Sequence, residues 1–295
     1  EFLGKHRKVT HMSSFDDFKK KSRSSIDDLT KALEETNGAT KSYKDERFWR
    51  PELDKASNGF AIIRFLPTPP NEELPFAKLY SHGFQGKGGW FIENSRTTLG
   101  EKDPVSEMNS ELWNSGIESD KDIARTRKRK LQYISNILVV SDPANPQNEG
   151  KVFLYKYGKK IFDKIQEAAQ PEFADEEAVD VFNFWEGANF KLKVRRVAGF
   201  INYDKSEFDS AAPLFDGDDS KLEELWNKQY SLTAFTDPSN FKSYEELKTR
   251  LQEVIGEDIR STEARTSTVE DVPSSEVNSI DESKDETDAL SYFEK

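Results

Sequence analysis

Five basic side chains lie within six residues at positions 125–130, at the start of the stretch RTRKRKLQYISNILVV. The apolar, β-branched run that follows is typical of a buried strand. Cations at the start of a rigid strand could hold a line of phosphates, because Lys and Arg neutralise a nucleic-acid backbone. This segment stands out because the whole chain is acidic, with 43 Lys and Arg against 55 Asp and Glu and a formal net charge of -12.

Two further segments place cations beside aromatic rings, as the first segment does with Tyr133. The candidate contact residues are Arg125, Arg127, Lys128, Arg129, Lys130, Tyr133, Tyr155, Tyr157, Lys159, Lys160, Lys191, Lys193, Arg195, Phe200 and Tyr203. Cations follow phosphates and rings stack on unpaired bases, at about 1–3 kcal/mol per base, so the mixture predicts a surface for single-stranded nucleic acid. No helix motif that reads a duplex groove occurs in the sequence. One segment alone also fits a solvated strand face, and one ring alone also fits a core; the three segments together favour nucleic acid.

Local patterns predict the elements that must position these residues. Strands are expected within residues 58–70, 131–146, 151–158 and 189–203, and helices over 24–35, 159–169, 220–232 and 243–258. In the last strand region, alternation places Lys191, Lys193 and Arg195 on one face and the residues between them on the other. Ser243 is a predicted cap for the last helix. The fold class is therefore α+β with a mainly β core.

The two ends of the chain differ in charge and are expected to lie outside the core. Residues 1–25 hold seven basic and three acidic residues, whereas residues 261–295 hold three basic and ten acidic residues. The arm lacks apolar periodicity, and the tail has too few large apolar residues to repay its ordering entropy, so both are predicted to be flexible. The expected parts are an arm with a short helix over 1–34, a core over 35–260 and a tail over 261–295. Residues 1–11 are either native or derived from cloning with Met12 as the start, because Glu-Phe and His-Met are what common cloning sites encode.

The absence of Cys and of long apolar runs excludes several classes of protein. The chain has no Cys, which excludes disulfides and thiolate metal ligands. No apolar run approaches the roughly 20 residues that a membrane-spanning helix needs. The expectation is a soluble, intracellular protein without membrane contact.

Long motifs resemble one family. The stretches NILVVSDPANPQNEGKVFLYKYGKKIFDKI (residues 136–165) and WEGANFKLKVRRVAGFINYDKSEF (residues 185–208) are similar to the helix-destabilising single-stranded DNA-binding proteins of T4-like bacteriophages. The shorter motifs IRFLP, PFA, HGF, GGWFIE and FKSYEEL occur in the same order as in that family, and the resemblance spans roughly residues 17–256. It implies a distorted OB-fold barrel with a small subdomain and flanking helices, which binds DNA in an electropositive cleft.

The resemblance also implies roles for residues and partners. It assigns Lys128, Arg129 and Lys130 to the DNA backbone and Tyr133 to a base, although Leu131, Gln132 and Ile134 depart from the family pattern. It implies cooperative self-association through an N-terminal motif, matched in part by Lys19, Lys20, Lys21, Ser22 and Arg23. It further implies that the protein coats single strands during phage DNA replication, recombination and repair, in the cytoplasm of the infected bacterium. Phage replication and recombination proteins would bind its acidic tail.

Zinc is expected to be absent. Related proteins hold zinc with one His and three Cys, and here His82 is kept while Ser95, Asp103 and Ser106 stand at the Cys positions. One imidazole with oxygen ligands is a poor tetrahedral zinc site. The subdomain is then expected to be held by packing of Phe84, Trp90, Ile92, Leu99, Met108, Leu112 and Trp113.

Two other functions stay open beside single-stranded DNA binding. A metal-dependent nuclease could use Asp103, Glu107 or Asp204, but the sequence has no clustered carboxylate motif, P-loop or Ser/His/Asp arrangement. Catalysis is therefore not expected. The resemblance also implies RNA binding with translational repression as a secondary role, because phosphate and stacking contacts discriminate poorly between RNA and DNA.

Overall fold

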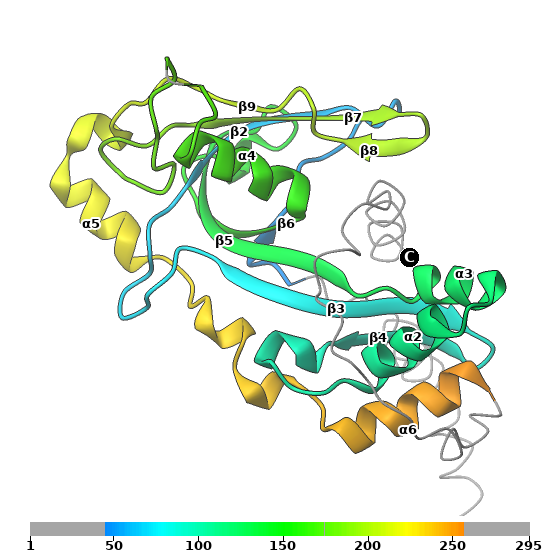
Figure 1. Cartoon of the computed structure of the whole chain (residues 1–295). Coiled ribbons are helices and arrows are strands. Elements are labelled where there is room, and N and C mark those ends of the chain that lie inside the picture. The colour runs from blue at the N-terminus through cyan, green and yellow to red at the C-terminus, as the bar shows by residue number, and fades with distance from the viewer. Residues whose placement is uncertain (1–44, 174, 257–295) are drawn as a thin grey trace, which may run out of the picture. The chain divides into compact units, whose positions relative to one another are not determined.

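The computed structural model describes residues 45–173 and 175–256. The predicted arm, the helix over 24–35, the docking residues Lys19–Lys21, Ser22 and Arg23 and the acidic tail lie outside these ranges. Within them the fold is mixed α+β, as expected (Figure 1). The strands are β1 (Phe48–Trp49), β2 (Gly59–Phe65), β3 (Ala77–Gly86), β4 (Gly89–Asn94), β5 (Lys130–Ser141), β6 (Val152–Tyr157), β7 (Phe190–Val197), β8 (Phe200–Asn202) and β9 (Glu207–Phe208). The α-helices are α2 (Pro104–Asn114), α3 (Glu118–Thr126), α4 (Lys159–Ala169), α5 (Asp219–Asn227) and α6 (Tyr244–Ile255).

The strands form one sheet in which β5 is shared by three neighbours. The path runs β1-β6-β5-β2-β7-β8, β3 pairs with both β4 and β5, and β9 pairs with β7. β5 pairs antiparallel with β3 through residues 130–134, with β6 through residues 133–138 and with β2 through residues 137–141. The predicted strand after the basic segment is thus confirmed, and it lies at the centre of the sheet (Figure 1).

The main core lies on one face of the sheet and consists mostly of aromatic and β-branched side chains from β2, β5, β6 and β7. Ile63, Phe65, Ile137, Phe190 and Leu192 are fully buried in it. α4 covers part of this face through Ile161 and Ile165. The expected helix over 159–169 is confirmed residue for residue, because its apolar positions recur at the spacing of one helical face.

α6 closes a second core against the β3–β4 hairpin. Leu247, Leu251 and Val254 pack on Phe84 and Phe91 from the hairpin. The helix begins with the predicted Ser243 cap, which forms a capping box with Glu246. Gly88 permits the close approach, since a Cβ there would lie 1.9 Å from the carbonyl oxygen of Glu253.

Two of the expected fillers of this subdomain are wrong. Trp90 and Ile92 are 39% and 43% exposed, because they alternate with the buried Phe91 and so face away from α6. Phe84 is buried, and Met108 packs on the same core. Leu112 and Trp113 are half-buried on α2, and Leu99 packs on a different cluster, beside Leu79 and Phe241.

Candidate nucleic-acid interface

The basic segment, residues 125–130, connects α3 to β5. Arg125 lies in the last turn of α3, Arg127 caps it, and Lys130 begins β5 opposite Ser81 of β3. Asn109 of α2 holds the connection by donating from Nδ2 to the carbonyl oxygen of Arg127 at 2.8 Å. The segment is therefore fixed at both ends by regular structure.

Alternate cations of the basic segment lie over aromatic rings. The guanidinium carbon of Arg125 is 5.3 Å from the centre of the Trp113 ring, that of Arg127 is 5.5 Å from Phe84, and that of Arg129 is 4.1 Å from Tyr80. Such contacts orient a cation while leaving it charged. The contacts of Tyr80 and Trp113 with these cations could not be predicted from the sequence, because their strand and helix are separated from the basic segment along the chain.

The cations of the basic segment differ in their ion pairs. Arg125 pairs with Glu118 at 2.9 Å and with Asp122, and these carboxylates raise the pKa of Arg125. Between residues 45–173 and 175–256, Arg127, Lys128 and Arg129 have no carboxylate partner within ion-pair distance. Burial lowers the pKa of Arg127. The strongest uncompensated positive charge of the segment thus lies at residues 127–129.

The predicted cations on β7 are each paired within the chain. Lys191 contacts Asp209 at 3.0 Å, and Lys193 contacts Glu207 at 2.8 Å. Arg195 donates from Nε to Asp204 Oδ1 at 2.9 Å. The predicted alternation is confirmed, since Leu192 and Val194 between them are buried. All three pairs are exposed enough for solvent and salt to weaken them.

Three predicted stacking rings are buried together. Tyr133, Tyr155 and Tyr157 are 5%, 3% and 4% exposed, and Tyr157 shares a 2.9 Å hydrogen bond with the Ser135 hydroxyl. Burial raises the pKa of Tyr157. The Tyr133 ring lies parallel to the ring of Phe162 on α4, with centres 3.9 Å apart and 3° between the planes. A base could reach Tyr133 only if Phe162 moved, so base stacking there stays a prediction.

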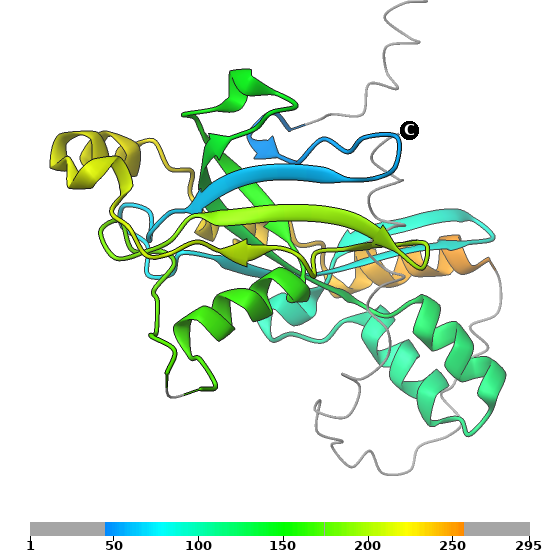
Figure 2. The same cartoon turned by 90° about the horizontal axis from the view of Figure 1, so that it is seen from above.

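The remaining predicted residues lie on other elements. Phe200 and Tyr203 are half-buried, on β8 and directly after it, and Tyr203 packs on the main core. Lys159 and Lys160 begin α4, where Lys159 contacts Asp163 at 2.7 Å. In both views the β7–β8 hairpin lies at the same end of the sheet as α2 and α3 (Figure 2). The structure therefore brings the first and third segments to one end of the sheet and places α4 farther along it.

Asp103 ties the β3–β4 hairpin to the start of α2. Its Oδ1 contacts His82 Nε2 at 2.9 Å and accepts from the backbone of Val105 and Ser106, while its Oδ2 accepts from Ser95 and the backbone of Arg96. His82, Ser95 and Asp103 are 2%, 0% and 1% exposed. Burial raises the pKa of Asp103, but the hydrogen bond and charge of His82 and the backbone donors outweigh it, so its pKa is lowered to about 2.

The positions that the resemblance aligned with metal ligands thus meet, but their donors suit hydrogen bonding. Asp103 accepts hydrogen bonds from the side chains of His82 and Ser95, and Ser106 contributes its backbone N–H to the same carboxylate. In the described ranges, no group of three or more His, Asp and Glu side chains could hold a metal ion. Serine hydroxyls and one carboxylate are poor replacements for three thiolates, so the residues do not fit zinc.

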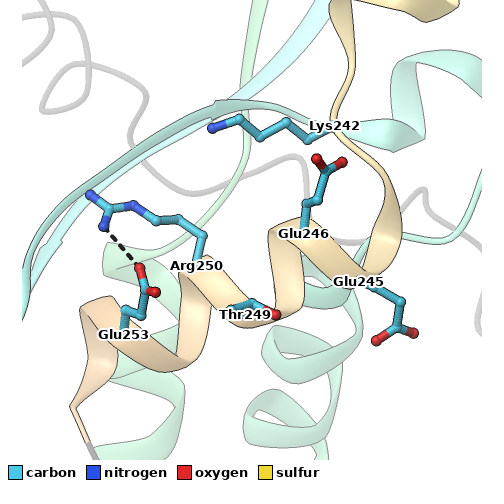
Figure 3. Close-up of a pocket in the computed structure, with 6 residues that line it drawn as sticks. All are labelled: Lys242, Glu245, Glu246, Thr249, Arg250 and Glu253. Atoms are coloured by element: carbon cyan, nitrogen blue, oxygen red, sulfur yellow. Dashed lines mark hydrogen bonds and ion pairs between the residues drawn. The ribbon is translucent and has the colours of Figure 1, made fainter.

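The hollow beside α6 has no link to the basic segment. Lys242, Glu245, Glu246, Thr249, Arg250 and Glu253 line it (Figure 3). Arg250 pairs with Glu253 at 3.2 Å, and Lys242 pairs with Glu93 of β4. Carboxylates therefore compensate both cations of the hollow.

The described ranges contain no helix long and apolar enough to cross a membrane.

The chain is similar to known proteins over most of its length. A family model described as gp32 DNA binding protein like matches residues 57–255. The chain belongs to this gp32-like family. The single-stranded DNA-binding protein of Enterobacteria phage T2 is 45% identical over 245 residues, which cover 81% of this chain and 80% of that protein. The protein of the same name from Enterobacteria phage T4 is 44% identical over 255 residues, with 84% and 83% covered. The resemblance read from the sequence motifs is confirmed.

Acid unfolding should report on the Asp103 cluster. A carboxylate with a lowered folded-state pKa stabilises the fold above its unfolded pKa and loses that contribution as pH falls through the folded value. For Asp103 the loss should occur between about pH 4 and pH 2. Asp103→Asn should lower the free energy of unfolding at pH 7 and flatten its dependence on pH in that window, as measured by denaturant titrations. Asp175→Asn, at an exposed position, is the control; an equal acid dependence in Asp103→Asn and wild type would contradict the assignment.

Proposed function

We propose that the protein binds single-stranded DNA cooperatively and largely without sequence preference, and that it coats single strands during phage replication, recombination and repair. The observation that carries the proposal is the fixed basic segment, whose cations at residues 127–129 have no carboxylate partner in the described ranges. Relatives that cover most of the chain are named single-stranded DNA-binding proteins. The site of action is then the cytoplasm of the infected host.

The sheet supports a distorted OB-type barrel as the core of this function. OB-folds bind oligonucleotides on a strongly curved sheet and its loops. β5 supports such curvature because it exchanges partners along its length, from β3 to β6 and β2. The β7–β8 hairpin and the basic segment would then flank the bound strand.

Binding alone explains the proposed action without catalysis. A protein that binds single strands better than duplex shifts the melting equilibrium by mass action. The carboxylates considered for a nuclease have separate partners: Asp103 contacts His82, Glu107 accepts from the Tyr244 hydroxyl at 2.6 Å, and Asp204 pairs with Arg195.

RNA binding, with translational repression as its consequence, remains the second candidate function. Titrations with DNA and RNA strands of matched sequence separate it from single-stranded DNA binding.

The basic segment and the rings should affect DNA binding differently. Replacing Lys128, Arg129 and Lys130 with Ala should weaken binding to all single strands and flatten the salt slope by about 0.7 per lost phosphate contact. Replacing Phe200 and Tyr203 with Ala should weaken binding with little change in slope, because stacking releases few counterions. Fluorescence titrations with one-site oligonucleotides at several salt concentrations measure both quantities.

The paired cations of β7 provide a matched control. Lys191→Ala with Lys193→Ala should change the slope less than the triple replacement, since carboxylates already compensate these lysines. Equal slopes in the ring and basic variants would show that the division of roles is wrong. An unchanged affinity in the triple variant would contradict the proposed function itself.

We also propose that no zinc is bound. The support is that the Asp103 carboxylate already accepts hydrogen bonds from His82 and Ser95, the side chains that would have to bind the metal with it. Elemental analysis of protein purified without a chelator should find no stoichiometric zinc, and a chelator should leave the melting temperature unchanged. Stoichiometric zinc, or destabilisation by the chelator, would contradict this proposal.

The two charged ends are proposed to regulate binding in opposite ways. Lys19, Lys20, Lys21, Ser22 and Arg23 of the arm are proposed to dock on a neighbouring protomer. The acidic tail is proposed to compete with phosphate for the basic segment, because a tethered polyanion has a high local concentration. Single strands would displace it more readily than duplex, since they add base stacking. The displaced tail would then be open to replication and recombination proteins.

Titrations with shortened chains test both ends. Deleting residues 1–25 should abolish clustering on long strands and leave binding to a one-site oligonucleotide nearly intact. Deleting residues 261–295 should lower the melting temperature of duplex in the presence of the protein, most strongly at low salt, where screening is weakest. A comparable loss on the short oligonucleotide would assign the arm to simple DNA contact, and unchanged duplex melting at low salt would exclude tail competition.

A further inference from the structure

Two large aromatic side chains are exposed together next to α5. Trp185 is 53% exposed and Phe215 is 38% exposed. Trp185 lies against the turn that contains Phe215, because a Cβ built on Gly217 would be 3.8 Å from Trp185 Cδ1. We call Trp185 and the turn at residues 215–217 the aromatic platform. In both views α5, which follows this turn, lies at the opposite end of the described core from α3 and the basic segment (Figures 1 and 2).

A buried arginine holds the platform in place. Arg64 is 2% exposed and donates from Nη2 to the carbonyl oxygens of Asn183 at 2.9 Å and Ala212 at 3.0 Å. These two residues lead into the segments that carry Trp185 and Phe215. Gly187 makes room for the contact, since a Cβ there would lie 2.3 Å from the Asn183 oxygen and 2.9 Å from the guanidinium. The exposed rings therefore lie on a rigid support.

The backbone that presents Phe215 is strained. Phe215 has φ 51° and ψ 35°, and Asp216 has φ 54° and ψ 24°, so two side-chain-bearing residues adopt the left-handed region in succession. This conformation costs on the order of 1–2 kcal/mol per residue. The result is an aromatic ring directed to solvent while the preceding Leu214 is buried. Strain that exposes an apolar ring is more typical of a binding surface than of a core.

The charge of the platform selects its occupant. Exposed carboxylates lie beside it along the chain at Glu186, Asp216 and Asp219, and Lys221 is paired with Asp218 at 3.6 Å. Negative charge disfavours both DNA and the acidic tail. The complementary segment of this chain is FDDFKKKSRSS at residues 15–25, which combines two Phe with four basic and two acidic residues. Rings and cations in one short peptide match rings and carboxylates on one surface.

We propose that the aromatic platform receives residues 15–25 of a second copy of the chain. This inference rests on the proposed cooperative binding and names the surface that accepts the arm. A contact between the arm of one copy and a different surface of the next is heterologous when it is not reciprocated, and it can then continue from copy to copy. Such a contact produces a linear array, which suits a protein that coats a strand.

Clustering on long strands tests the platform. Trp185→Ala with Phe215→Asn removes both rings, and Asn tolerates the left-handed backbone at position 215. The double variant should lose about tenfold in cooperativity on long single strands, as expected for the loss of central interface residues, and bind a one-site oligonucleotide like wild type. Leu74→Ala with Ile117→Ala is the matched control, because these side chains are 58% and 55% exposed elsewhere on the core. The melting temperatures of all variants check folding.

A charge exchange tests the partner directly. Glu186→Lys with Asp219→Lys should weaken clustering, as should Lys19→Glu with Lys20→Glu, and the chain that carries all four changes should recover it. Unchanged clustering in the ring variant, an equal loss on the short oligonucleotide, or no recovery on charge exchange would overturn the proposal. If deletion of residues 1–25 leaves clustering intact, the arm's role in cooperativity fails as well. Loss of one-site binding in the basic-segment variant separately tests DNA binding.

Discussion

The hydrogen bonding of β5 with three other strands is the constraint on which the described core depends. Its first residues pair with β3, its middle with β6 and its end with β2. Side chains of neighbouring residues point to opposite faces, so a slip by one residue would move Ile137 out of the main core to the face where Leu138 packs on a different cluster. The same register places Lys130 opposite Ser81, and so fixes the point at which the basic segment enters the sheet. The position of the cations is thus a consequence of how the central strand is buried.

The hydrogen bonds of Asp103 show how a small subdomain can be stabilised without thiolates. The carboxylate accepts from side chains of β3 and the turn after β4, and from the backbone at the start of α2. A buried carboxylate is costly unless several donors compensate it, and here five donors contact its two oxygens. Hydrogen bonds therefore connect the same elements that a tetrahedral metal would connect. The packing of Phe84, Phe91 and α6 completes the subdomain.

The sequence predicted those elements whose local signals agree with their burial. α4 and α6 have regular apolar spacing, and α6 also has its Ser243 cap and Gly256 at its end. The β3–β4 hairpin was not predicted as strands, because its glycines interrupt the alternation of apolar residues. Asp103 and Pro104 align with the metal motif of related proteins, but Asp before Pro is also a helix-start signal, and α2 begins there.

The candidate site was predictable in its residue types but not in their environments. Tyr133 is covered by Phe162, which follows it by almost thirty positions on a separate helix. The partners of the β7 cations, at residues 204–209, come from the chain after the β8 hairpin turns back. Neither the cover nor the partners can be read from spacing within one strand. Periodicity indicates which face a side chain lies on; only the tertiary fold decides what faces it.

These environments divide the cations into two physical classes. A lysine paired with a carboxylate, such as Lys193 with Glu207, neutralises a phosphate less completely than an unpaired cation, and so displaces fewer condensed counterions. It can still orient a strand by exchanging one anionic partner for another, because exposed pairs are weak. On the proposed binding of DNA, Lys128 and Arg129, with no carboxylate partner in the described ranges, would gain a full new interaction instead. Affinity should therefore concentrate at the α3–β5 connection, while the β7–β8 hairpin mainly sets the path of the strand across the sheet.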